Sequence, residues 1–108
     1  MTLHQLPFGT SLTDSLLQVI RAGDDTCYRE TPHLRMSLMW VKAKKGNEPW
    51  TMKWGLFAVE RKHMQRDDIF RVDGITLHID ETARMRSVGK VLDWQKGVGV
   101  IEIVTPSA

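Results

Sequence analysis

The sequence predicts a small α+β domain that is mostly β, in which an N-terminal helix packs on a β-sandwich-like core of about five or six short strands. Two periodicities indicate this class. Ile75, Leu77 and Ile79 alternate with polar residues, which places three apolar side chains on one face of a strand. Leu12 and Leu16 begin an apolar stripe with helical spacing, which is typical of an amphipathic helix. A short helix is also expected between the later strands.

The first helix is expected to begin near Ser11 and to end at Gly23, because glycine is common just beyond a helix C-terminus. A polar loop with Cys27 and Tyr28 would then follow it. Asp80 is the candidate N-cap of the second helix, at residues 81–88. The expected strands are 34–43, 51–60, 67–72, 75–80, 90–96 and 98–104. Turns between elements are expected at four glycines: Gly46, Gly74, Gly89 and Gly97.

The chain of 108 residues is long enough for one domain with its own core. We expect residues 1–10 to form a flexible N-terminal arm, residues 11–104 to form the domain and residues 105–108 to form a short tail. Cys27 is the only cysteine, which excludes an internal disulfide and fits a reducing compartment, so a cytoplasmic protein is expected. No apolar run approaches the length of a membrane span, so no membrane partner is expected.

Four short motifs follow one another along the chain. They are the strand start Leu34–Arg35, the turn and strand from Asp73 to Asp80, the segment Gly89–Trp94 and the closing segment Gly97–Ile103. In their order and spacing these motifs resemble the HesB/IscA-like family, the A-type carriers of iron–sulfur cluster biogenesis. The resemblance covers residues 11–104, and it implies that the chain has the small α+β fold of that family.

The resemblance also implies where cluster ligands would lie. Family members use one cysteine in the loop after the first strand and a Cys-Gly-Cys near the C-terminus. Here that loop reads Lys44–Asn47 and the tail reads Thr105–Ala108, so neither segment contains a cysteine. Because thiolates hold the iron of such clusters, we expect this chain to carry no iron–sulfur cluster and no other cofactor.

Cys27 and His33 are weak candidates for a metal site. Six positions separate them, which matches no strong metal-binding motif, and a buried or idle thiol is the favoured interpretation. His78 and Asp80 share the polar face of one strand, as a proton-transfer pair would. No nucleophile is placed beside them by the sequence, so a solvated pair is favoured and no enzymatic activity is expected.

The middle of the chain is basic. Residues 40–66 contain seven lysines and arginines and two glutamates, a net charge of +5 in a chain whose total is +2. Cations that neutralise phosphates and rings that stack on bases are the elements of single-stranded nucleic-acid binding. The favoured alternative is a hairpin whose tryptophans fill the core and whose lysines protect an edge strand. Trp54 fits the buried face by alternation, and Trp50, at the end of the loop, is the candidate for an exposed ring. The candidate contact residues are Lys42, Lys44, Lys45, Trp50 and Lys53.

These observations leave three functional hypotheses. The first is a non-catalytic HesB-like domain without the cluster-ligating cysteines, an accessory or binding module whose partner is another protein or a second copy of the chain. The second is a genuine iron or iron–sulfur carrier that uses Cys27 across a dimer. The third is a single-stranded nucleic-acid-binding β-domain that uses the basic region 40–66.

Overall fold

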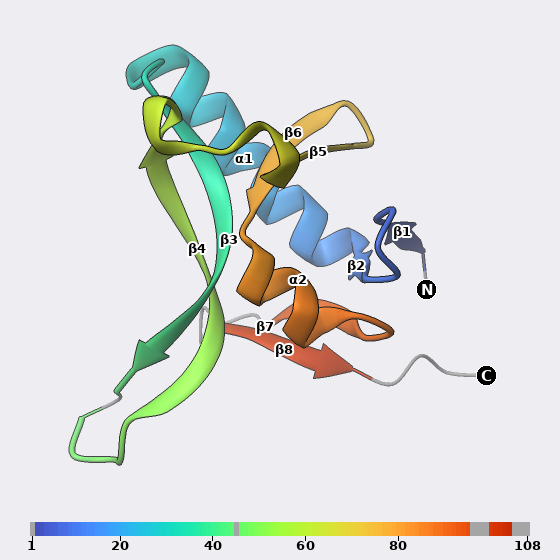
Figure 1. Ribbon diagram of the computed structural model, residues 1–108, viewed down its shortest axis with the longest axis vertical. Helices are drawn as coiled ribbons and strands as arrows, with labels where there is room; N and C mark the ends of the chain where they lie inside the picture. Colours follow the sequence, from blue (N-terminus) through green and yellow to red (C-terminus); the bar gives the residue numbers. More distant parts are fainter. Residues whose placement is uncertain (1, 45, 96–99, 105–108) are drawn as a thin grey trace.

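The computed structural model contains two helices and two four-stranded sheets (Figure 1), and it describes residues 2–44, 46–95 and 100–104. The α+β class with a majority of strands is therefore confirmed. The helices are α1 (Asp14–Glu30) and α2 (Glu81–Ser87), with short 3₁₀ turns at Arg61–His63 and Arg66–Asp68. The strands are β1 (Leu3–Gln5), β2 (Ser11–Thr13), β3 (Leu34–Ala43), β4 (Thr51–Glu60), β5 (Ile69–Val72), β6 (Ile75–Ile79), β7 (Val91–Gln95) and β8 (Val100–Val104).

Each sheet contains one parallel pair between antiparallel neighbours. The first sheet has the order β1-β2-β7-β8, and its parallel pair is β2 with β7. The second sheet has the order β4-β3-β6-β5, and its parallel pair is β3 with β6. In that pair Ser37 lies opposite His78, and Leu38 lies opposite Ile79. The central pairings of both sheets therefore join segments far apart in the sequence.

One hydrophobic core joins the helices to both sheets. The fully buried stripe of α1 includes Leu16 and Ile20, as the helical periodicity predicts. These side chains belong to the same buried cluster as Leu38 of β3, Ile79 of β6 and Leu92 of β7. Among the described residues, neither helix is long and apolar enough to cross a membrane.

The N-terminal residues differ from the sequence prediction. Instead of a flexible arm, residues 3–13 form a hairpin of β1 and β2 that raises the number of strands to eight. Leu6 and Thr10 are buried in it, and Ser11 and Leu12 of β2 pair with β7. Strands of three residues are too short to show a period, and the partner of β2 lies about 80 positions away, so local reasoning could not find them.

The first helix is also longer than predicted. It begins after Thr13, continues through Gly23 and ends at Glu30, so Cys27 and Tyr28 are helical. Gly23 has a packing role instead of a capping one, because a Cβ atom there would lie 2.8 Å from the Sδ and Cε atoms of Met36. The missing side chain thus lets α1 approach β3 closely, which compensates for the weak helix propensity of glycine.

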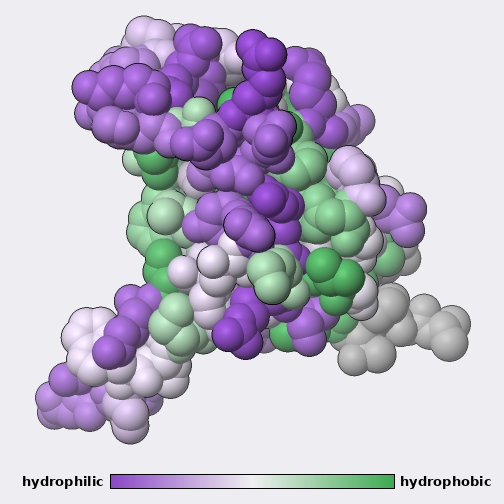
Figure 2. Space-filling view, viewed as in Figure 1, coloured by the Kyte–Doolittle hydropathy of each residue, from purple (hydrophilic) through white to green (hydrophobic). Residues whose placement is uncertain are grey.

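The β3–β4 hairpin agrees with the predicted strand bounds and pairs in register from Leu34–Glu60 to Ala43–Thr51. Its distal part extends away from the rest of the molecule (Figure 1), and Figure 2 shows it as a projection at the lower left. We call residues 41–44 and 46–53 the hairpin arm. Lys45, at its turn, and the predicted turn residue Gly97 lie outside the described residues.

Candidate functional site

The end of the hairpin arm presents one aromatic ring and two cations to solvent. Trp50 is 58% exposed, whereas Trp54 is buried, as the alternation along β4 predicts. The ammonium groups of Lys42 and Lys44 lie 5.7 and 5.9 Å from the centroid of the Trp50 ring, within the range of cation–π attraction. The arm therefore holds these three side chains together although six to eight residues separate Trp50 from the lysines.

Strand pairing places these residues on one face of the arm. Lys42 lies opposite Met52 in the β3–β4 register. Lys44 comes two positions after Lys42, and Trp50 comes two positions before Met52, so both lie nearer the turn of the hairpin. Side chains at opposed positions point to the same face, as do side chains two residues apart. Met52 is also exposed. We call Lys42, Lys44, Trp50 and Met52 the tip cluster.

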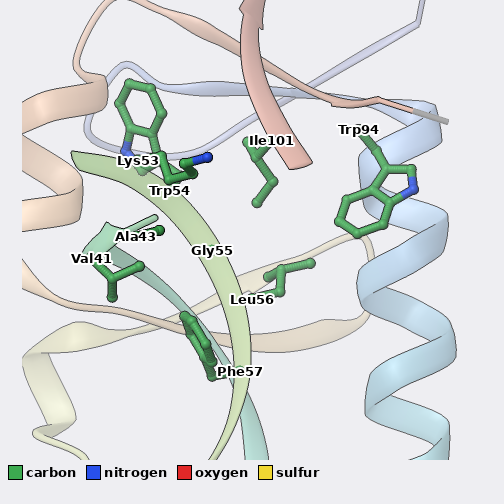
Figure 3. Close-up of a pocket in the computed structure, with 9 residues that line it drawn as sticks. All are labelled: Val41, Ala43, Lys53, Trp54, Gly55, Leu56, Phe57, Trp94 and Ile101. Carbon is green, nitrogen blue, oxygen red and sulfur yellow. The ribbon is translucent and has the colours of Figure 1, made fainter. Parts of the chain in front are cut away.

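Lys53 does not belong to the tip cluster. It lies opposite Val41 in the register and is half-buried, on the other face of the arm. There it borders a groove of about 240 Å³ between β4 and the first sheet. Figure 3 shows Trp94 and Ile101 of that sheet facing Leu56 of β4. The groove is lined by Val41, Ala43, Lys53, Trp54, Gly55, Leu56, Phe57, Trp94 and Ile101.

The predicted turn glycines within the described residues adopt turn conformations. Gly46, Gly74 and Gly89 have φ of +59°, +78° and +75°, a left-handed region that favours glycine. Gly46 thus lets the chain reverse between β3 and β4 and sets the geometry of the arm. Gly89 reverses the chain between α2 and β7.

Cys27 and His33 are in different environments. Cys27 is 3% exposed in α1, and His33 is exposed in the turn before β3. A thiol shared between two chains must reach the surface, so the burial of Cys27 argues against such a ligand. Among residues 2–44, 46–95 and 100–104, no group of three or more histidine, cysteine, aspartate or glutamate side chains is placed to hold a metal ion.

His78 has partners that the sequence did not indicate. His78 and Asp80, which the sequence placed on one solvated face, do not form a hydrogen bond with one another, because Asp80 caps α2 by accepting a hydrogen bond of 2.8 Å from the Ala83 amide. His78 Nδ1 instead lies 2.7 Å from Ser37 Oγ, and His78 Nε2 lies 3.8 Å from Asp68 Oδ2. Asp68 is also bound by Arg84. Ser37 and His78 are 41 positions apart, and only the parallel pairing of β3 with β6 brings them together.

This Ser–His–Asp arrangement does not expose a nucleophile. Ser37 is fully buried, so its hydroxyl cannot approach a substrate carbonyl in this conformation. Its hydrogen bond to His78 satisfies a polar group inside the fold. The hydrogen bond therefore has a structural role at Ser37. The side chain of His78 is 11% exposed and reaches the surface only in small part.

The fold and these surfaces define a small α+β domain with a projecting hairpin. No family model matches the chain, and no curated protein matches it. Among solved structures, a protein of Aquifex aeolicus determined by solution NMR is similar, with a TM-score of 0.60 and 18% sequence identity. The match covers 98% of this chain and 100% of the Aquifex chain. At this identity the likeness shows the fold alone, and it extends over essentially the whole length of both chains.

Proposed function

We propose that this chain is a non-catalytic binding module, a HesB/IscA-like domain without cluster-ligating cysteines, whose contact surface is the tip cluster. The observation that carries the proposal is the exposure of Trp50, at 58%, on an arm that projects from the core. Tryptophan is among the residues that contribute most to protein interfaces, because its large ring gains much from desolvation while its indole N–H donates a hydrogen bond. Because the Trp50 ring stays exposed after folding, its desolvation can still stabilise a complex with a partner protein.

Charge indicates the chemistry of the partner surface. Lys42 and Lys44 flank Trp50, and Glu48 is the acidic residue of the same loop. A protein surface with an apolar centre and an acidic rim complements this arrangement. Two tip clusters facing one another would bring like charges together, which disfavours a dimer formed through the arms. We therefore propose an acidic protein partner.

The experiment is affinity capture from lysate with four forms of the tagged chain, with and without nuclease. The arm variants are Trp50→Ala and the pair Lys42→Glu and Lys44→Glu. The matched control is Met85→Ala, because Met85 is 71% exposed on α2, away from the arm. We expect a protein that the wild type and the control retain after nuclease treatment and that both arm variants lose. Equal capture by the arm variants and the control would contradict the proposal.

Single-stranded nucleic acid is the second candidate, favoured by the two cations beside the Trp50 ring. The test is titration of labelled single-stranded DNA and RNA at several salt concentrations. Phosphate contacts would make log K fall with log salt by about 0.7 per contact, so Lys42→Ala with Lys44→Ala would reduce the slope by about 1.4. Loss of base stacking in Trp50→Ala would cost about 1–3 kcal/mol. We expect weak binding that disappears near physiological salt. Submicromolar binding at physiological salt that is lost in Trp50→Ala would instead favour nucleic acid as the partner.

A further inference from the structure

A second, polar pocket lies away from the hairpin arm. It has a volume of about 270 Å³, and side chains from five elements, including Ile69 of β5, border it. Arg35 comes from β3, Thr76 and His78 come from β6, Tyr28 comes from α1 and Arg61 comes from the 3₁₀ turn after β4. The parallel β3–β6 register explains the grouping, because Ser37 opposes His78 and the residues two positions earlier, Arg35 and Thr76, share their face.

Arg35 is a buried cation held in place by neutral groups. It is 9% exposed, and its Nη1 donates hydrogen bonds to the carbonyl oxygens of Pro32, at 3.1 Å, and Leu34, at 2.7 Å. Its guanidinium lies 4.0 Å from the centroid of the Tyr28 ring. None of the ion pairs formed among the described residues includes Arg35. A guanidinium has five N–H donors, so the Nε and Nη2 edge of Arg35 retains donors for a ligand.

Acidic groups near the pocket neutralise its positive charge only in part. Asp68, which faces His78, is already bound by Arg84. Burial raises the pKa of Asp24 above its ordinary value of 3.8, and the positive charges of Arg35 and Arg71 oppose that increase. Asp24 does not border the pocket, so its carboxyl group does not occupy the position of a ligand. Arg61 adds an exposed second guanidinium at the pocket.

We propose that this pocket binds a small molecule through a phosphate or carboxylate group. Arg35 and Arg61 supply the charged donors, since guanidinium matches both groups in fork geometry. The hydroxyl of Thr76 accepts from Arg71 Nη1 at 3.4 Å, which leaves its own proton free to donate to the ligand. Ile69 and Met64 give the pocket an apolar wall, and the volume fits a ligand smaller than a typical drug-sized molecule.

The experiment is NMR and thermal-shift titration of the purified chain with inorganic phosphate, glycerol phosphate, acetate and succinate. Sodium chloride at matched ionic strength is the control for general salt effects. We expect saturable amide shifts at residues 28, 35, 61, 76 and 78 with at least one of these anions. A stronger response to the two phosphates identifies a phosphate site, and a stronger response to acetate or succinate identifies a carboxylate site. Shifts that sodium chloride reproduces would overturn the proposal.

Variants separate binding from folding, because Arg35 also supports the backbone and its replacement could unfold the chain. Arg61 is exposed, so Arg61→Gln should fold normally and should weaken binding by about tenfold through loss of a charged hydrogen bond. Arg66→Gln is the matched control, because Arg66 is an exposed cation of the next 3₁₀ turn that does not border the pocket. Asp24→Asn removes a negative charge that interacts with Arg35, so it should tighten the binding of an anion. Equal affinities for the wild type, Arg61→Gln and Asp24→Asn would refute the site.

Discussion

Thr13 donates its hydroxyl proton to Asp93 Oδ1, across 80 positions of the sequence. The same hydroxyl oxygen accepts a hydrogen bond of 3.3 Å from the Leu16 amide, as the N-cap of α1. One buried side chain therefore connects the start of the helix to strand β7. This link lies beside the parallel β2–β7 pair and holds the N-terminal hairpin in the first sheet.

Replacement of Thr13 by valine should lower the free energy of unfolding by roughly 1–3 kcal/mol, because it removes the cap and leaves Asp93 without a donor. Thr13→Ser keeps the hydroxyl and is the matched control. Urea denaturation followed by circular dichroism measures both changes. If the serine variant lost as much stability as expected for the valine variant while valine lost little, the methyl group and not the hydroxyl would be the stabilising part.

Ile79→Asp should be strongly destabilising. Ile79 is fully buried in β6 and lies opposite Leu38. An aspartate there would place an unpaired carboxylate in the core, at a cost of about 3–5 kcal/mol. Ile103→Asp on β8 is the control, because Ile103 is 49% exposed and its replacement should change stability by less than about 1 kcal/mol. Equal melting temperatures for the two variants would contradict the register of β6.

The contact of Gly23 with Met36 predicts a measurable coupling. Gly23→Leu should destabilise the chain by about 1–3 kcal/mol, because the new side chain would overlap the end of Met36. Met36→Ala makes room, so the double variant should be less destabilised than the sum of the single ones, by about 0.5–3 kcal/mol. Ala22→Leu, at the neighbouring exposed helical position, is the control and should have little effect. Additive effects in the cycle would show that the two sites do not touch.

Asp24 predicts a pH dependence of stability. It is 7% exposed, its Oδ1 has no hydrogen-bond partner among the described residues, and burial raises its pKa in the folded state. The folded protein then binds this proton more tightly than the unfolded chain, so the carboxyl group's contribution to stability falls as pH rises from 3.8 through the raised folded pKa. Asp24→Asn should therefore be more stable than the wild type at pH 7.

The difference between Asp24→Asn and the wild type should shrink as pH is lowered through the folded pKa toward 3.8. Thermal unfolding at several pH values measures it. Asp25→Asn is the control, because Asp25 is an exposed neighbour on the same helix. A wild type that is more stable than Asp24→Asn at neutral pH would show that Arg35 and Arg71 outweigh the cost of burial.

The chain should carry no iron–sulfur cluster when it is purified anaerobically. The loop position at which the resemblance places a ligand holds no cysteine, and the single cysteine of the chain, Cys27, is buried in α1. Visible absorption spectra before and after cluster reconstitution test this expectation. Absorbance that survives gel filtration in the wild type and disappears in Cys27→Ser would support the carrier hypothesis instead.

Local pattern was sufficient for much of the fold. The bounds of β3 and β4, the alternation of β6, the cap Asp80 and the turn at Gly89 all follow from residues within a few positions of one another. Side-chain period and turn chemistry act over that range, so the sequence alone determined these elements. It also placed Trp54 on the buried face of β4, whereas the favoured interpretation that the tryptophans fill the core was wrong for Trp50, which is exposed.

Tertiary structure decided the remaining features, because each depends on partners that are distant in the sequence. Gly23 lies within α1 where the helix faces Met36, and β2 pairs as a strand with β7, about 80 positions away. The pairing of β3 with β6 brings Ser37 to His78 and Arg35 beside Thr76, which creates the polar pocket. Parallel strands need a crossover connection, and no local propensity encodes which two strands will meet. The sequence alone therefore determined most of the elements and the basic hairpin, whereas long-range packing decided the N-terminal strands, the length of α1 and which side chains lie together.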